Sequence, residues 1–321
     1  MADSKISALP AVVTPTDTDE YAVNQGDISK KITRAQIFTN PVHSSYDDQT
    51  AIADPAAPGA NTLRSYAKSI AGRILPKFVG PDGIDTAIQP ALFQNRVSLW
   101  TPGTGTAPLY SGQTATLGAT ASHPTPATTS FGQSLSRARF ATSTTAGNAS
   151  GLRSPIGTAY AGNATVRGGY FFNARFLNGS LHTNGVQKMC GMSSSTSLLA
   201  GEPSSSMADF IGMCLDSTDA NWQFSRRTGT GAATKVNLGV AAAADQVFEL
   251  TMFMAPSGTA LFVRILQFGV AGAPTILLDT SFNTVLPAVT TALGLHIQVR
   301  NGALAAAHNI EMSRIYLESD Y

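Results

Sequence analysis

The chain has 321 residues, of which 13% are charged, and a formal net charge of +1. A nucleic-acid-binding domain normally carries a basic surplus or a basic stripe, so this composition predicts no nucleic-acid partner. The 29 glycines and 17 prolines, with abundant Ser, Thr and Ala, are typical of short strands joined by many turns. Low charge also suits surfaces that are buried against other subunits.

The sequence gives no sign of a membrane segment. Residues 1–5 lack the basic and apolar regions of a secretion signal, and the chain has no run of about 18 apolar residues. We therefore expect synthesis in the cytoplasm and no membrane insertion.

The first predicted element is a β-hairpin. Residues 20–24 and 27–32 form two short runs around Gly26, and glycine supplies the positive φ that a tight turn requires. Thr33 is a suitable N-cap for one or two helical turns that end near Phe38. A unit this small cannot bury a core of its own, so we expect it to pack on another surface.

This N-terminal segment resembles the one by which appendage proteins of tailed bacteriophages are tethered to the virion. The resemblance rests on Ala-Leu-Pro-Ala at 8–11, Thr-Asp-x-Asp at 16–19, Gln-Gly at 25–26 and Lys-x-Thr at 31–33. It implies that residues 1–39 dock on another virion protein of the tail, collar or capsid. The apolar side chains that would make this contact are Tyr21, Val23, Ile28, Ile32, Ala35 and Phe38.

The next part, residues 40–95, is expected to be a linker followed by a connector. Residues 40–60 are rich in Pro, Asp and Ala and have no period, as in a linker. The runs 62–70 and 74–79 on either side of Gly72 predict a second hairpin. This stretch also resembles the connector that precedes a C-terminal β domain in virion proteins of tailed phages.

Residues 96–321 predict a mainly β domain. The expected strands lie at 137–142, 170–176, 208–215, 221–227, 233–238, 247–255, 261–268 and 293–300. In the last run, the apolar parity changes between Met312 and Ile315, which a bulge near Ser313 and Arg314 would reconcile. Many short strands with almost no helical pattern favour a β-sandwich or jelly roll.

The C-terminal part resembles the lectin-like sandwiches of the same phage proteins, which assemble as trimers. The resemblance lies in the series from Asp216 to Gly239 and in the ending from Ile315 to Tyr321. The run 261–268 is apolar on both faces, so one face should be buried at an interface or in the centre of the fold. We therefore expect a homotrimer.

The sequence offers little for metal or cofactor chemistry. The five histidines are scattered without ligand spacing, so we expect them to be exposed and no cofactor to be bound. Cys190 and Cys214 lie in apolar runs, which favours two buried reduced thiols over a disulfide between them. Asp216, Asp219 and Asn221 could ligate Ca²⁺, but ordinary turn chemistry explains them better.

We expect no enzymatic activity. The serine clusters lack the Gly-x-Ser-x-Gly elbow of a hydrolase. The carboxylates of the β domain show no paired pattern for glycan hydrolysis. They are Glu202, Asp209, Asp245, Glu249, Asp279, Glu311, Glu318 and Asp320.

An aromatic residue next to two arginines suggests a receptor surface. Trp222 could stack on a sugar ring, and Arg226 and Arg227 could meet an anionic sugar. The alternative is that Trp222, Phe224 and Tyr170 belong to the sandwich core or to a trimer contact.

Three functions remain open at this point. The first is a fibre or spike subunit of a tailed phage, located in the virion, anchored by its N-terminus and able to bind a host-surface glycan. The second is a decoration or cement protein of the capsid or collar, without a receptor role. The weakest is a glycan-cleaving tailspike.

Overall fold

The computed structural model describes residues 20–25, 28–33, 49–56, 58–79, 85–87, 95–102, 115–118, 121–154, 157, 159–162, 168–255, 258–269 and 271–320. The fold is mainly antiparallel β. By contacts, the chain divides into a small unit, Met1–Thr50, and a large unit, Ala51–Tyr321. No helix among the described residues is long and apolar enough to cross a membrane.

The predicted N-terminal hairpin is confirmed. Strand β1 (Glu20–Gln25) pairs antiparallel with β2 (Ile28–Thr33), and Tyr21 lies opposite Ile32. Of the proposed docking residues, Tyr21, Val23, Ile28 and Ile32 lie in these strands. Ala35, Phe38 and the helix expected after Thr33 lie outside the described residues.

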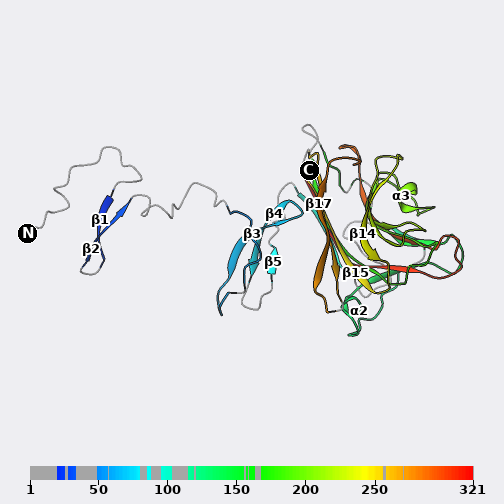
Figure 1. Ribbon diagram of the computed structural model, residues 1–321, viewed down its shortest axis with the longest axis horizontal. Helices are drawn as coiled ribbons and strands as arrows, with labels where there is room; N and C mark the ends of the chain where they lie inside the picture. The colour runs from blue at the N-terminus through cyan, green and yellow to red at the C-terminus, as the bar shows by residue number, and fades with distance from the viewer. Residues whose placement is uncertain are drawn as a thin grey trace, which may run out of the picture. The chain divides into compact units, whose positions relative to one another are not determined.

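The large unit contains two facing sheets of seven strands each (Figure 1). The first, here called the β10 sheet, has the order β17-β16-β15-β10-β19-β6, with β8 paired to β19. Its strands are β6 (Asn95–Trp100), β8 (Ala138–Ala141), β10 (Tyr170–Asn178), β15 (Gln246–Met254), β16 (Leu261–Phe268), β17 (Pro274–Phe282) and β19 (Asn309–Asp320).

The second sheet, here called the β11 sheet, has the order β14-β13-β12-β11-β18-β9-β7. Its strands are β7 (Ala115–Leu117), β9 (Ala149–Arg153), β11 (Gln187–Ser193), β12 (Ile211–Leu215), β13 (Asn221–Arg226), β14 (Thr234–Ala241) and β18 (Gly294–Arg300). Two short helices, α2 (Phe131–Ser134) and α3 (Pro203–Ser206), lie in loops.

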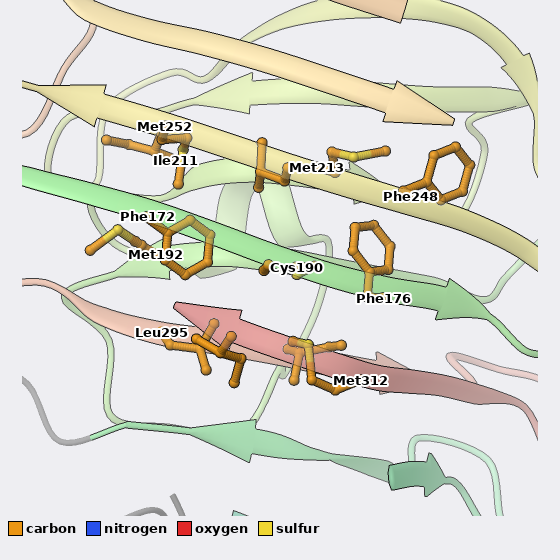
Figure 2. Packing of buried hydrophobic residues seen from close by; sticks show 14 of the residues in the cluster. Phe172, Phe176, Cys190, Met192, Ile211, Met213, Phe248, Met252, Leu295 and Met312 are labelled. Atoms are coloured by element: carbon orange, nitrogen blue, oxygen red, sulfur yellow. The ribbon is translucent and has the colours of Figure 1, made fainter. Parts of the chain in front are cut away.

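The hydrophobic core fills the space between these two sheets (Figure 2). Alternate residues of each strand point inward, because successive side chains of a strand face opposite sides. On β10 these include Tyr170, Phe172 and Phe176, and all three are buried. Sulfur-containing side chains of β11, β12, β15 and β19 fill gaps between the rings, including Met192, Met213, Met252 and Met312.

Several sequence predictions are confirmed by the pairing. The strands expected at 208–215, 221–227 and 233–238 are present as β12, β13 and β14, which form an antiparallel meander, and β15 pairs with β16. The predicted bulge in the last strand lies at Ser313, since Arg175 pairs with Arg314 but Phe176 pairs with Met312. This extra residue lets Met312 and Ile315 both face the core.

The connector hairpin consists of β3 (Arg64–Ile70) and β4 (Arg73–Val79), which pair antiparallel as expected; β5 (Asp85–Ala87) adds a third strand. Its tight turn has Ala71 at φ 49° and Gly72 at φ 75°, as a two-residue turn with positive φ at both positions requires. Gly72 lies against the ring of Phe262, where an added Cβ would come within 2.7 Å. The connector therefore packs on the outer face of the β10 sheet.

This packing changes the argument for β16. Leu261, Val263 and Ile265 face the core, as expected for one face of the strand. On the other face, Phe262 stacks with Phe253 and meets Gly72, and Phe268 contacts Phe131 of α2. The chain thus covers part of that face itself, and the apolar pattern of β16 alone does not require a second subunit.

The outer face of the β11 sheet is covered by the loop that joins β11 to β12 and contains α3. Leu199, Met207 and Phe210 of this loop form a second buried cluster with Met189 and Cys214. Cys190 belongs to the main core instead. The two cysteines are free and buried on opposite faces of one sheet, so the expectation of two buried thiols is confirmed.

Candidate functional site: a groove beside the connector hairpin

A groove of about 340 Å³ lies between the connector hairpin and the outer face of the β10 sheet. Its lining combines an apolar side with a polar floor. The lining residues are Ile70, Leu75, Leu99, Phe171, Asn173, Glu249, Thr251, Arg314 and Tyr316. A concave, mostly apolar surface with a few convergent polar groups is the usual form of a ligand site.

The register of three strands brings the floor together. Asn173 of β10 lies opposite Thr251 of β15 on one side and Tyr316 of β19 on the other. Glu249 and Arg314 lie opposite Arg175 in the same two neighbouring strands. All of these positions have the parity that points away from the core, so six polar or aromatic groups share one small patch.

The floor is held by a continuous set of hydrogen bonds. Arg175 Nη2 and Arg314 Nη2 each donate to Glu249 Oε2 at 2.7 Å. Arg314 Nη2 also lies 3.1 Å from Asn173 Oδ1, and Asn173 Nδ2 donates to Thr251 Oγ1 at 2.9 Å. Burial lowers the pKa of Arg314, although the nearby Glu249 opposes that shift. One carboxylate between two guanidinium groups leaves a local positive excess.

The apolar side has an aromatic pair. Phe171 and Tyr316 contact edge to face with ring centroids 6.0 Å apart. The Tyr316 hydroxyl donates to Glu318 Oε2 at 2.9 Å, and burial together with Glu318 raises the pKa of Tyr316. Leu99 remains 56% exposed at the rim of the groove.

The connector hairpin is fastened beside the groove by an ion pair. Arg73 donates from Nη1 to Glu318 Oε2 at 2.7 Å and from Nη2 to Glu318 Oε1 at 2.6 Å, a bidentate arrangement. The Arg73 guanidinium also lies 5.1 Å from the centre of the Phe171 ring. This contact fixes the distance between the hairpin and the floor, and so the width of the groove.

The residues predicted as a receptor surface lie elsewhere and are buried. Trp222 is fully buried between Phe176 and Phe248, so the alternative assignment to the core is the correct one for its ring. Phe224 and Tyr170 are core residues as well. An aromatic ring with no exposed face cannot stack on a sugar.

The two arginines next to Trp222 also have structural partners. Arg226 lies over the Phe282 ring and donates to the carbonyl of Thr284 at 2.5 Å. Arg227 donates to the carbonyls of Met207, Thr230 and Gly231 at 2.7–2.9 Å. Both are buried, so the expectation that they form an exposed basic surface is wrong for this structure.

The acidic loop considered for Ca²⁺ holds a lysine instead. Lys235 Nζ lies 2.7 Å from Asp216 Oδ2 and 2.6 Å from Asp219 Oδ2. The main-chain N–H of Asp216 donates to Asp219 Oδ2, which is the turn chemistry that the sequence favours. Among the described residues, no group of three or more His, Cys, Asp or Glu could hold a metal ion.

Two histidines differ from their expected exposure. His296 is fully buried under the loop between β11 and β12, and His308 is buried near Lys188. Burial and the nearby Arg153 lower the pKa of His296 to about 3. His43 lies outside the described residues.

The sequence held one clue to the groove. The alternation of β10 places Phe171, Asn173 and Arg175 on the face opposite the core, and that face was visible in the pattern. The sequence does not indicate that Thr251, Arg314 and Tyr316 lie beside these residues, because their proximity depends on the order of the strands in the sheet. Strands β15, β10 and β19 are neighbours in the sheet but far apart in the chain.

Comparison with solved structures supports the fold. A protein of unknown function from Shewanella oneidensis MR-1 superposes with a TM-score of 0.50 and 12% identity, covering 72% of this chain and 89% of that protein. Basic winged bean lectin with Tn-antigen aligns with a TM-score of 0.46 and 9% identity over 71% of this chain and 99% of its own. Peanut lectin aligns with a TM-score of 0.44 and 10% identity over 70% and 97%. No protein-family model and no curated protein sequence matches the chain.

Proposed function

We propose that this chain is a structural virion protein of a tailed phage, a fibre or spike subunit anchored by its N-terminus. The proposal is supported by a small unit, Met1–Thr50, that is separate from a large sandwich unit. The β1–β2 hairpin of the small unit coincides with the segment that resembles a virion tether. A two-stranded hairpin is marginally stable alone, so docking on another virion protein would give it the missing contacts.

The sandwich is the part that binds the host surface, and the groove beside the connector is the observation that carries this role. Its amide, carboxylate and guanidinium groups can exchange hydrogen bonds with sugar hydroxyls, and its aromatic edge offers an apolar contact. The local positive excess around Arg314 favours a saccharide that carries an acidic group. This site replaces the surface around Trp222, which is buried.

The test is adhesion of the full-length protein to host cells, compared between two matched variants. Leu99→Glu places a negative side chain at the rim of the groove, where residue 99 is 56% exposed, and should repel an acidic saccharide. Ile276→Glu makes the same change at a residue of β17 that is 54% exposed and does not line the groove. Both should fold as the unmodified protein does, because exposed substitutions change stability by roughly 0.5 kcal/mol or less.

We expect Leu99→Glu to reduce adhesion at least tenfold, which corresponds to a loss of about 1.4 kcal/mol of binding free energy. Ile276→Glu should leave adhesion unchanged. Equal adhesion by both variants would remove the groove as the host-binding site. No adhesion by the unmodified protein, with immunogold label found over the capsid or collar, would favour a decoration protein without a receptor role.

A further inference from the structure

A lysine lies inside the sandwich at one end of the core. Lys188 of β11 has the same parity as Cys190 and Met192, so its side chain points between the sheets and is fully buried. Its Nζ lies 2.5 Å from Asn178 Oδ1, 2.8 Å from the carbonyl of Ser180 and 3.0 Å from Ser180 Oγ. Asn178 ends β10, in the opposite sheet, and is also fully buried.

The surroundings of Lys188 favour the uncharged form of its amine. Burial lowers the pKa of Lys188 to about 7, against the opposing effect of Glu311. Glu311 itself is bound by Arg137 and Arg139, which limits the charge it offers to the lysine. His182 and His308 also lie near Lys188, and burial and this lysine lower the pKa of both. A substantial fraction of Lys188 is therefore an uncharged nucleophile near neutral pH.

The amide of Asn178 is held in one orientation beside the amine of Lys188. Its Nδ2 donates to the carbonyl of Ala243 at 2.6 Å, so the amide nitrogen is fixed on one side and the carbonyl oxygen is turned to Lys188. The amine of Lys188 and the side-chain amide of Asn178 are thus in direct contact, and both side chains are fully buried. These hydrogen bonds satisfy the ammonium form, and once the amine loses a proton it lies beside a carbonyl group that an amine can attack.

We propose that Lys188 and Asn178 join in an intramolecular amide bond. The lone pair of Nζ attacks Cγ of Asn178 and forms a C–N bond. One Nζ proton passes to the side-chain nitrogen of Asn178, the bond from Cγ to that nitrogen breaks, and ammonia leaves. The step balances without an oxidant, reductant or cofactor, since an amine and a primary amide give a secondary amide and ammonia.

Such a bond ties the two sheets together at one end of the sandwich. It joins the last residue of β10 to β11 across the core, a link that the two cysteines cannot make, because they lie on opposite faces of the β11 sheet. A covalent link of this kind stabilises the fold mainly by restricting the unfolded chain. The inference goes beyond the proposed function and does not depend on it.

The mass of the full-length protein, measured after denaturation, tests the proposal. We expect a mass lower than that of the sequence by one ammonia. Trypsin digestion of the unfolded protein should then fail to cut after Lys188 and give one peptide that spans residues 176–226. A full mass with normal cutting after Lys188 would overturn the proposal.

Asn178 precedes Gly179, and such a pair can also lose ammonia by closing a succinimide on its own backbone. That product leaves Lys188 free, so a mass deficit with normal cutting after Lys188 would also overturn the proposal. Lys188→Met and Asn178→Ala should each restore the full mass, and Asn178→Asp should lose water instead. Lys235→Met, which removes a lysine bound by carboxylates, should keep the ammonia deficit.

Discussion

Arg227 shows how a side chain that suggests recognition in the sequence serves stability in the fold. Its guanidinium is buried and donates to three main-chain carbonyls, two in the turn after β13 and one at Met207. A guanidinium is planar and has five N–H donors, so it can donate hydrogen bonds to several main-chain carbonyls at once. This suits a place where two loops meet without pairing their main chains.

We predict that Arg227→Ala lowers the free energy of unfolding by about 2–3 kcal/mol, since hydrogen bonds from a charged donor are lost and carbonyls are left unpaired. Urea unfolding followed by fluorescence measures this. Arg227→Lys keeps the positive charge but not the planar set of N–H donors, so it should lower the free energy of unfolding by less than Arg227→Ala does. An unfolding curve for Arg227→Ala that coincides with that of the unmodified protein would contradict this assignment.

His296 makes the stability depend on pH. In the folded protein, burial and Arg153 lower the pKa of His296 to about 3, whereas in the unfolded chain this residue has its ordinary pKa of 6.5. Between these values the unfolded chain takes up a proton that the folded chain does not, so stability falls as the pH falls.

Because of His296, the free energy of unfolding should therefore fall by about 1.4 kcal/mol for each pH unit below 6.5. We predict that His296→Gln, which cannot take up the proton, shows a shallower decline between pH 6 and pH 4. Urea unfolding of both proteins across this range gives the difference between their free energies of unfolding. The carboxylates titrate alike in the two proteins, so their effect cancels in this difference. Parallel slopes would show that His296 titrates alike in the folded and unfolded states.

At the scale of the element, a buried ion pair is one of the contacts that hold the connector hairpin on the β10 sheet. Glu318 is 1% exposed, and Arg73 neutralises it with two hydrogen bonds. The removal of one member of a buried pair leaves the other charged and poorly solvated. Arg73→Ala should therefore cost about 3 kcal/mol of stability and expose the hairpin to proteases.

Arg64→Ala is the matched control, because Arg64 lies on the same hairpin but is exposed and donates to a single carbonyl, that of Ala56. We expect a change within about 0.5 kcal/mol for this variant. Limited proteolysis should cut β3 or β4 faster in Arg73→Ala than in the control. Equal cutting rates in the two variants would mean that the hairpin is held by apolar contacts alone.

The elements themselves were largely predictable from the sequence. Period-two alternation in β10 and β18, and the parity change at Ser313, depend only on neighbouring residues of the chain. The burial of His296 and Arg227 was not predictable, because the loop between β11 and β12 that covers them could as well have pointed into solvent. The groove required the order of the strands, which local patterns do not specify.

At the scale of the whole molecule, the case for a trimer shifts to a different surface. Part of the outer face of β16 is covered by the connector and α2, but Leu63 and Ile74 of the connector are 64% and 54% exposed. We predict that light scattering of the full chain gives a trimer, and that Leu63→Asp combined with Ile74→Asp lowers the mass. Ile276→Asp, an equally exposed change on β17, should leave the mass unaltered. A monomer at micromolar concentration would contradict the expected assembly.

The last prediction concerns the separation of the chain into two units. Because Ala51–Tyr321 holds the whole described core, the deletion of residues 1–50 should leave the thermal midpoint of the sandwich nearly unchanged. The same deletion should abolish incorporation into phage particles, since the β1–β2 hairpin would supply the docking contacts. Sedimentation of particles followed by immunoblotting measures this, with the full-length chain as the control. Normal incorporation of the folded truncated chain would contradict the tether and would place the anchor in the sandwich unit instead.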